Sequence, residues 1–173
     1  MEKNLLISEE EIACKVAKCA QWLNTEYAGQ EVILVLILKG AIVFAADLIR
    51  QLTISFQLEC VQASSYGMKG TIPDDEVKIG SVQQLGLRGK EVVVVDDIFD
   101  RGETLYRVIE MIKLEEPKRV QSLVLLRKKR EQKISYAPDY VCFDIEDRFV
   151  IGYGLDYKEH FRGLKDIYIT HVC

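Results

Sequence analysis

Three aspartates near the middle of the chain have the residue type and spacing for binding a polar substrate or for moving a proton. Asp96 and Asp97 directly follow four valines, Val92–Val95, and Asp100 comes shortly after them. An apolar run that stops at acids predicts a buried strand that delivers carboxylates to the edge of a sheet. Because open α/β sheets bind their substrates at that edge, we expect these aspartates to lie in a binding crevice.

A short polar turn follows the acids and leads into a helix. After Gly102, apolar residues recur at helical spacing from Leu105 to Ile112. Unpaired amides at a helix start, together with the helix dipole, favour an anion such as phosphate. The two carboxylates would repel that phosphate, but they can accept hydrogen bonds from sugar hydroxyls or approach Mg²⁺ carried by substrate phosphates. Acids beside such a turn therefore suit a phosphorylated sugar.

Four ordered segments resemble one enzyme family. The run from Val92 to Leu105 is similar to the phosphoribosyl-pyrophosphate binding motif of the type I phosphoribosyltransferases. Three further segments, in the right order along nearly the whole chain, narrow the resemblance to the hypoxanthine-guanine phosphoribosyltransferases. These segments are Leu38-Lys39-Gly40, Ser65-Tyr66, and Asp147-Arg148-Phe149-Val150 with the following Gly152–Tyr157 and Phe161-Arg162.

The resemblance implies roles for the residues around the acidic turn. Asp96 and Asp97 would accept hydrogen bonds from the two ribose hydroxyls, and Asp100 would act as general acid or base beside the purine. The backbone amides of the turn, with the Thr104 hydroxyl, would hold the 5-phosphate. The turn residues in question are Arg101, Gly102, Glu103 and Thr104. On composition alone, the aspartates could equally be strand-end or Asx-turn residues.

The family pattern also implies a pyrophosphate site, a metal and a lid. Lys39 and Gly40 would direct their amides at pyrophosphate across a cis Leu38–Lys39 peptide, and Arg162 would contact it directly. Mg²⁺ would be the cofactor, with Asp156, Asp96 and Asp97 as candidate ligands. The segment opened by Ser65 and Tyr66 would close over the reacting centre and exclude water, although a polar loop with glycines is also typical of an ordinary surface loop.

A purine pocket is implied by residues from the last third of the chain. A basic cluster follows a predicted strand and consists of Arg127, Lys128, Lys129, Arg130 and Lys133. By the resemblance, Lys128 would donate to the carbonyl oxygen of a 6-oxopurine and thereby reject adenine. Lys129 is the close competitor for that role, and a solvated turn is the ordinary interpretation of such a cluster. Phe149 would stack on the base, although an aromatic residue of this kind is also typical of a protein core. The backbone of Val150 would bind the edge of the base, and Asp156 would lie beside the purine as well as bind Mg²⁺ on the pyrophosphate.

Two positions depart from the family pattern. The usual Thr between the catalytic Asp and the Gly is Arg101 here, and the first acid of the pair, commonly Glu, is Asp96. The Arg101 guanidinium could either add a charged contact to the phosphate or point into water. The sequence leaves both alternatives open.

Size and composition bound the class of protein. The 173 residues fit a single phosphoribosyltransferase domain, residues 1–173, and 49% hydrophobic with 29% charged residues is ordinary for a globular chain. A net charge of -4 argues against a nucleic-acid binder. Five cysteines without a Cys-x-x-Cys pair suggest reduced thiols, and no signal peptide or membrane-spanning segment is recognisable, so we expect a cytoplasmic protein.

Hydrophobic periodicity predicts a mostly parallel α/β sheet with helices on both faces, plus a small hood built from the two chain ends. Helices are expected from Ser8 to Gly29, at Ala41–Leu52 and at Glu103–Lys113. Strands are expected at Val32–Leu38, Ile54–Ser64, Val77–Gln84, Val92–Val95, Val120–Leu126, Tyr140–Phe143, Val150–Tyr153 and Ile167–Thr170.

The resemblance implies a purine salvage enzyme that forms IMP or GMP from a 6-oxopurine and phosphoribosyl pyrophosphate. Its partners would be these small molecules, with neither nucleic acid nor membrane, and the chain would form a homodimer or homotetramer. One alternative is an RNA-binding regulator on the same fold, as in the pyrimidine-operon attenuation proteins, which usually lack an acid at the position of Asp100. Another is an enzyme of the same chemistry that prefers xanthine.

Overall fold

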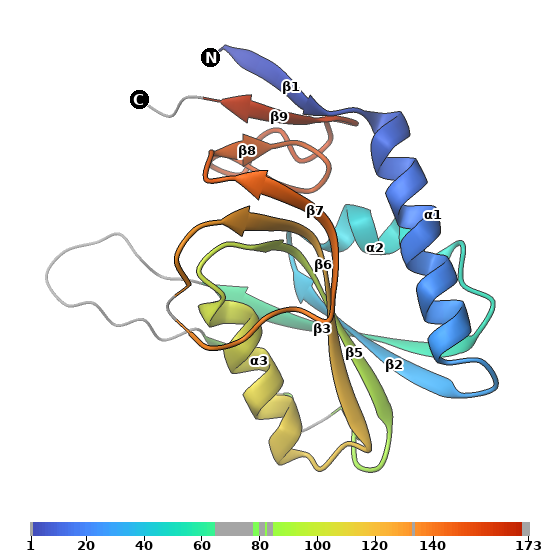
Figure 1. The fold of residues 1–173 in the computed structure, drawn as a ribbon. Helices are drawn as coiled ribbons and strands as arrows, with labels where there is room; N and C mark the ends of the chain where they lie inside the picture. Colours follow the sequence, from blue (N-terminus) through green and yellow to red (C-terminus); the bar gives the residue numbers. More distant parts are fainter. Residues whose placement is uncertain (1, 65–77, 80–81, 83–84, 133, 171–173) are drawn as a thin grey trace, which may run out of the picture.

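A six-stranded sheet forms the centre of the fold in the computed structural model, which describes residues 2–64, 78–79, 82, 85–132 and 134–170. Five of the strands are parallel, in the order β3-β2-β5-β6-β7, and β4 adds to the β3 edge in the antiparallel sense (Figure 1). The strands are β2 (Glu31–Leu38), β3 (Ser55–Ser64), β4 (Lys78–Ile79), β5 (Glu91–Phe99), β6 (Arg119–Lys129) and β7 (Tyr140–Glu146).

Helices cover both faces of this sheet, as the sequence predicts. The helices α1 (Glu9–Glu26) and α2 (Ile42–Ile49) pack on one face, and α3 (Glu103–Leu114) packs on the other (Figure 1). Along β5, Val93 and Val95 contribute to the core under α1 and α2, whereas Val92 and Val94 contribute to the core under α3. A continuous apolar run is therefore needed, because both sides of the strand are buried.

The start of α1 shows why the sequence identifies this helix so clearly. The Ser8 hydroxyl accepts a hydrogen bond from the amide of Glu11, and the Ser8 amide donates to the Glu11 carboxylate at 2.9 Å. This capping box satisfies two amides that the helix itself cannot pair. The predicted start at Ser8 is confirmed, and the helix ends at Glu26, shortly before Gly29.

A second, three-stranded sheet forms the hood above the carboxyl end of the main sheet. Its strands are β1 (Lys3–Ile7), β9 (Ile167–Thr170) and β8 (Val150–Ile151), antiparallel in the order β1-β9-β8 (Figure 1). The predicted origin of the hood in the two chain ends is therefore confirmed. Strand β1 was not predicted, since only Ile7 of this strand is buried and an apolar pattern is missing.

The strands β5, β6 and β7 extend further than the sequence predicts, and in β5 and β6 this moves candidate functional residues into the sheet. β5 was expected to end at Val95, yet it continues to Phe99, because Asp96 pairs with Val124 and Ile98 pairs with Leu126 on β6. β6 correspondingly runs to Lys129, so Lys128 lies inside a strand and not in a turn after it. Pairing with a neighbouring strand overrides the low strand propensity of these polar residues.

Another predicted strand is shorter than expected. β8 ends at Ile151 because Gly152 and Tyr153 adopt positive φ angles of 100° and 50°, which a strand cannot accommodate. Within the predicted strand at 77–84, Lys78–Ile79 forms a strand, and residues 77, 80–81 and 83–84 lie outside the described residues. Within the described part of the chain, no helix has the length and apolarity required to cross a bilayer.

Candidate functional site

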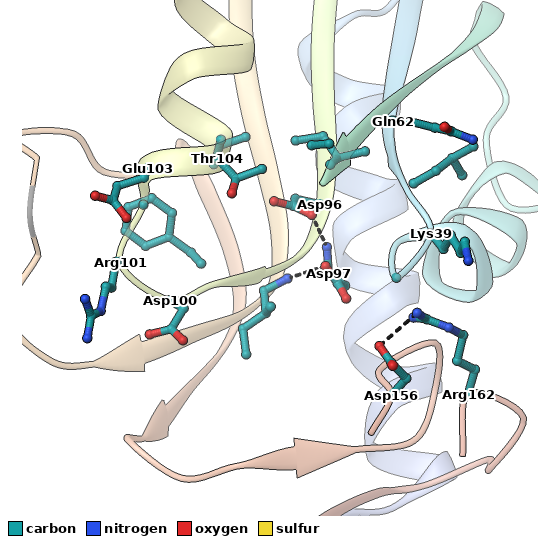
Figure 2. Close-up of a pocket in the computed structure, with 18 of the residues that line it drawn as sticks. Lys39, Gln62, Asp96, Asp97, Asp100, Arg101, Glu103, Thr104, Asp156 and Arg162 are labelled. Atoms are coloured by element: carbon teal, nitrogen blue, oxygen red, sulfur yellow. Dashed lines mark hydrogen bonds and ion pairs between the residues drawn. The ribbon is translucent and has the colours of Figure 1, made fainter. Parts of the chain in front are cut away.

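The candidate site begins where β2 and β5 stop pairing with each other. The last pair of their ladder joins Leu36 to Val95, and beyond it β5 stays bonded to β6 alone. Asp96 and Asp97 thus lie on a strand with one open edge. A pocket of about 860 Å³ occupies this opening, with residues 37–40 on one side and residues 96–105 on the other (Figure 2).

The two acids of this pocket are held in an environment that disfavours their charge. Asp96 is 5% exposed, and neither aspartate forms an ion pair within the described residues. Burial, followed by the charge of Asp97, raises the pKa of Asp96 well above its usual range. Burial also raises the pKa of Asp97, although contacts with Asp96 and local amides, and the charge of Arg162, oppose this. Buried carboxylates with so little compensation are suited to accepting hydroxyl hydrogen bonds or binding a cation.

Close backbone packing explains the glycine of the Leu38-Lys39-Gly40 segment. A Cβ atom at Gly40 would overlap the Asp97 carboxylate, and a Cβ atom at Gly154 would overlap the carbonyl oxygen of Gly40. Gly154 also has a φ of 97°, which L side chains rarely adopt. The Leu38–Lys39 peptide is cis, as the resemblance implies. Three segments far apart in sequence therefore meet here, with the backbone of Gly40 lying between the Asp97 side chain and the backbone of Gly154.

The turn between β5 and α3 forms the opposite wall. Gly102 is the N-cap of α3, with a φ of 84° and no side chain to accept the first amides of the helix. A helix start of this kind, without a side-chain cap, is suited to an anion in the pocket. The predicted phosphate residues, Arg101, Gly102, Glu103 and Thr104, all line the pocket together with Asp100 (Figure 2).

Charged side chains from the hood face the acidic turn across the pocket (Figure 2). Arg162 contacts Asp156 at 2.8 Å and Glu159 at 3.2 Å, and it donates to the Gly154 carbonyl at 2.8 Å. Lys39 pairs with the same Glu159 at 3.2 Å. Two cations thus lie beside the pocket, each of them held by acids that an incoming anion would have to displace.

Of the residues predicted to form the purine side, Lys128, Phe149 and Val150 do not line the pocket, whereas Asp156 does. Lys128 is only 10% exposed, and its ammonium lies 3.1 Å from the Asp100 carboxylate. Phe149 is 40% exposed and meets the Tyr157 ring edge-on at 5.7 Å, while Val150 is buried in β8. Asp156 lines the pocket itself. The purine roles of these residues stay predictions.

Several residues of the site were missed by the sequence argument. Glu159, which bridges Lys39 and Arg162, lies inside the motif from Gly152 to Arg162, so its position in that motif could have identified it. Gln62 lines the pocket from the end of β3, with no local signal. Arg130, treated as part of a solvated basic cluster, bonds directly to Asp100 at 2.8 Å. The predicted lid residues Ser65 and Tyr66 lie outside the described residues.

Comparisons with known proteins agree with this arrangement. Residues 5–158 match the family model described as a phosphoribosyl transferase domain. The hypoxanthine-guanine phosphoribosyltransferase of Aquifex aeolicus is 37% identical over 167 residues, which cover 96% of this chain and 93% of that protein. The hypoxanthine phosphoribosyltransferase of Escherichia coli is 36% identical over 162 residues, covering 92% of this chain and 90% of that one.

Solved structures agree as well. The crystal structure of a hypoxanthine-guanine phosphoribosyltransferase from Bacillus anthracis has a TM-score of 0.89 at 35% identity and covers 99% of this chain and 100% of its own. A hypoxanthine phosphoribosyltransferase of Trypanosoma cruzi has a TM-score of 0.84 at 30% identity, covering 96% of this chain and 95% of its own. The likeness therefore extends over both sheets.

Proposed function

Because the chain belongs to the hypoxanthine-guanine phosphoribosyltransferase family, we propose that it transfers the phosphoribosyl group of phosphoribosyl pyrophosphate to hypoxanthine or guanine. The products are IMP or GMP and pyrophosphate. The observation that carries this proposal is the position of Asp100, which lies between the start of α3 and the ammonium of Lys128. The Asp100 carboxylate thus lies between the turn at the start of α3, whose amides are suited to phosphate, and the Lys128 ammonium, which is suited to donating to a carbonyl oxygen.

The phosphoribosyl half of the substrate occupies the acidic wall of the pocket in this proposal. Asp96 and Asp97 accept hydrogen bonds from the ribose hydroxyls, and the amides of residues 101–104 hold the 5-phosphate. The support for these roles is geometric: neither carboxylate forms an ion pair within the described residues, and the start of α3 faces the pocket without a side-chain cap. In the complex, the ribose hydroxyls would donate hydrogen bonds to the carboxylates, and the 5-phosphate would accept hydrogen bonds from the amides.

Pyrophosphate occupies the wall formed by the hood. Its charge is met by Lys39, Arg162 and the amide of Gly40, and the acids now paired with the two cations are displaced when it binds. The purine lies beyond Asp100, where Lys128 donates to the 6-oxo oxygen, Phe149 stacks on the ring and the backbone of Val150 reads the base edge. A buried ammonium facing the amino group of adenine would leave two donors opposed, so adenine is rejected.

Mg²⁺ is the cofactor that we propose, and the residues present fit it. Asp96 and Asp97, and Asp156 on the facing wall, offer the oxygen ligands that Mg²⁺ prefers. Among the described residues, no three His, Cys, Asp or Glu side chains converge to hold a metal by themselves, so substrate phosphates and water must complete its coordination. When bound, the metal neutralises charge on the leaving pyrophosphate.

The proposed reaction needs no nucleophile from the protein. The bond from ribose to pyrophosphate breaks early, so that positive charge develops on the sugar while the purine approaches. The buried carboxylates of Asp96 and Asp97 stabilise that charge through the ribose hydroxyls. Asp100 accepts the proton from the imidazole nitrogen of the purine that does not form the new bond.

Steady-state kinetics with phosphoribosyl pyrophosphate and four bases test this proposal. Hypoxanthine or guanine should give a kcat/KM about 10⁴-fold above that of adenine, because a site that pairs with a carbonyl oxygen discriminates on that scale. Chelation of Mg²⁺ should abolish turnover. A preference for xanthine would contradict the base assignment, and inactivity with all four bases would overturn the proposed function.

We propose the cellular location from the cysteine composition and the oligomeric state from the family. The described cysteines, Cys14, Cys19, Cys60 and Cys142, are free thiols, which is typical of proteins kept in the reducing cytoplasm. A homodimer or homotetramer is expected from the family alone. Light scattering on the purified protein would measure its mass directly, and a monomer at assay concentration would contradict this expectation.

A further inference from the structure

The basic residues at the end of β6 divide into two pairs with opposite surroundings. Arg127 and Lys129 form ion pairs with their direct neighbours on β7, Asp144 at 2.6 Å and Glu146 at 3.1 Å. Because side chains alternate along a strand, Lys128 points to the other side of the sheet. Arg127 and Lys129 are 38% and 59% exposed, whereas Lys128 is only 10% exposed.

Arg130 lies on the same side as Lys128 and is 25% exposed. Its guanidinium donates to one oxygen of Asp100 at 2.8 Å, and the Lys128 ammonium donates to the other oxygen at 3.1 Å. Asp147 lies within 3.3 Å of Arg130 and 3.7 Å of Lys128. We call these four residues, Asp100, Lys128, Arg130 and Asp147, the Asp100 ion-pair group.

Charge within this group is balanced only because Arg130 is present. Two acids face two cations, so each carboxylate has a full positive charge to share. Without Arg130, the single ammonium of Lys128 would serve both carboxylates, and fewer of its three N–H groups would remain for a ligand. The second consequence is geometric, since Asp100 would be held through one oxygen and could rotate about its side-chain bonds.

We propose that Arg130 is a positioning residue that fixes the Asp100 carboxylate and leaves Lys128 available to the purine. This inference rests on the proposed function, in which Asp100 accepts a purine proton and Lys128 donates to the 6-oxo oxygen. Arg130 does not line the pocket and touches no substrate; it acts through Asp100. Preorganisation of this kind lowers the free energy needed to reach the reactive geometry, and a small displacement of a catalytic group lowers the reaction rate strongly.

The test compares Arg130→Gln, which loses the ion pairs to Asp100 and Asp147, with Arg127→Gln, a control three residues earlier on β6 that loses the ion pair to Asp144. For Arg130→Gln we expect kcat/KM for hypoxanthine to fall by roughly tenfold to a hundredfold. The KM for phosphoribosyl pyrophosphate should stay within about twofold of wild type, because its groups are untouched. Arg127→Gln should leave both parameters unchanged. An equal effect of the two substitutions would overturn the proposal.

Two further variants separate positioning from charge balance and from folding. Arg130→Lys keeps the charge and one donor, so its kcat/KM for hypoxanthine should lie between those of wild type and Arg130→Gln. The double variant Arg130→Gln with Asp147→Asn restores neutrality without restoring the bond to Asp100, so it should remain impaired; full recovery would overturn the proposal.

If Arg130→Gln does not fold, the test rests on Arg130→Lys. A kcat/KM for hypoxanthine equal to that of wild type would overturn the proposal. A reduced kcat/KM for hypoxanthine with a normal KM for phosphoribosyl pyrophosphate would support it. A KM raised equally for both substrates, together with a lowered melting temperature, would indicate a merely structural role and also overturn it. Failure of the proposed function itself looks different, because wild type would then be inactive with every base.

Discussion

The two ends of β5 carry buried acids in opposite electrostatic settings. At the amino end, Glu91 is 6% exposed and receives Lys118 and Arg119, each at 2.8 Å. At the carboxyl end, Asp96 is equally buried but has no cation partner within the described residues. Burial by itself would raise the pKa of Glu91, yet the bonds from Lys118 and Arg119 lower it; nothing comparable compensates Asp96, whose pKa rises.

In the proposed function, this difference separates a structural acid, Glu91, from a functional one, Asp96. A buried charge that the fold needs is neutralised within the fold, as at Glu91. A buried charge without such compensation reduces stability, and it persists where a ligand supplies the missing partner. The comparison predicts that substitutions at the amino end lower stability and leave catalysis intact, and that those at the carboxyl end impair catalysis without lowering stability.

The largest expected effect is on catalysis, at Asp100. Replacing Asp100 with Asn removes the proton acceptor, so kcat should fall by about 10²–10⁴-fold, the usual contribution of a general base. The fold should stay intact, because the side chain is partly exposed and forms only ion pairs at the sheet edge. Circular dichroism beside steady-state kinetics checks both points. Normal turnover would refute the role of Asp100.

The next effect tests the close packing at the mouth of the pocket. Gly40→Ala places a methyl group against the Asp97 carboxylate and should displace it from the ribose position. We expect kcat/KM for phosphoribosyl pyrophosphate to fall by roughly 10–100-fold, since displacement of a binding group by about 1 Å has costs on that scale. Gly163→Ala serves as the control for adding a methyl group to a glycine, because a Cβ atom there meets no atom within 4 Å and Gly163 does not have a positive φ.

At the amino end of β5, Arg119→Gln should change stability alone. It leaves Glu91 with Lys118 only and also removes the bond to Glu26. The expected loss is about 2 kcal/mol, below the value for a fully buried pair because the Arg119 side chain is 35% exposed. Chemical denaturation measures it, and kcat and KM should match wild type. A large loss of activity would contradict the claim that the ion pairs at the amino end of β5 affect stability alone.

The ion pairs of Glu91 with Lys118 and Arg119 also predict how stability depends on pH. The pKa of Glu91 is lowered on folding from its ordinary value of 4.5, so its stabilising contribution is present above that value and is lost as the pH falls through the folded pKa. Wild type should therefore lose stability below about pH 4.5 more steeply than Glu91→Gln. Melting temperatures of the two proteins across the acid range measure this difference, and parallel curves would contradict it.

The smallest expected effect has the opposite sign, at Asp96. Asp96→Asn keeps an acceptor for the Asp97 amide, which now donates to Asp96 at 2.9 Å, and it removes an uncompensated buried charge. Without substrate or Mg²⁺, we expect a gain of about 1 kcal/mol in the free energy of unfolding at neutral pH. Activity should fall at the same time. A variant that is both less stable and fully active would contradict the assignment of Asp96.

Much of the fold was predictable because it depends on local patterns. The capping box at Ser8, the valines of β5 and the helical spacing after Gly102 each carry their signal within a few residues. Strand ends were less predictable. Asp96 belongs to β5 only because Val124 of another strand pairs with it, and β1 carries too few buried residues to show a pattern.

The sequence by itself determined the order of the binding motifs, the acids after the valines and the glycine that starts α3, since each follows from neighbouring residues. Only the tertiary structure decided that Arg130 bonds to Asp100, thirty positions away, and that Glu159 joins Lys39 to Arg162. The parallel alignment of β5, β6 and β7 creates the first of these contacts, and the docking of the hood on the main sheet creates the second. Contacts between distant residues depend on how whole elements pack, and that information is spread over the entire core.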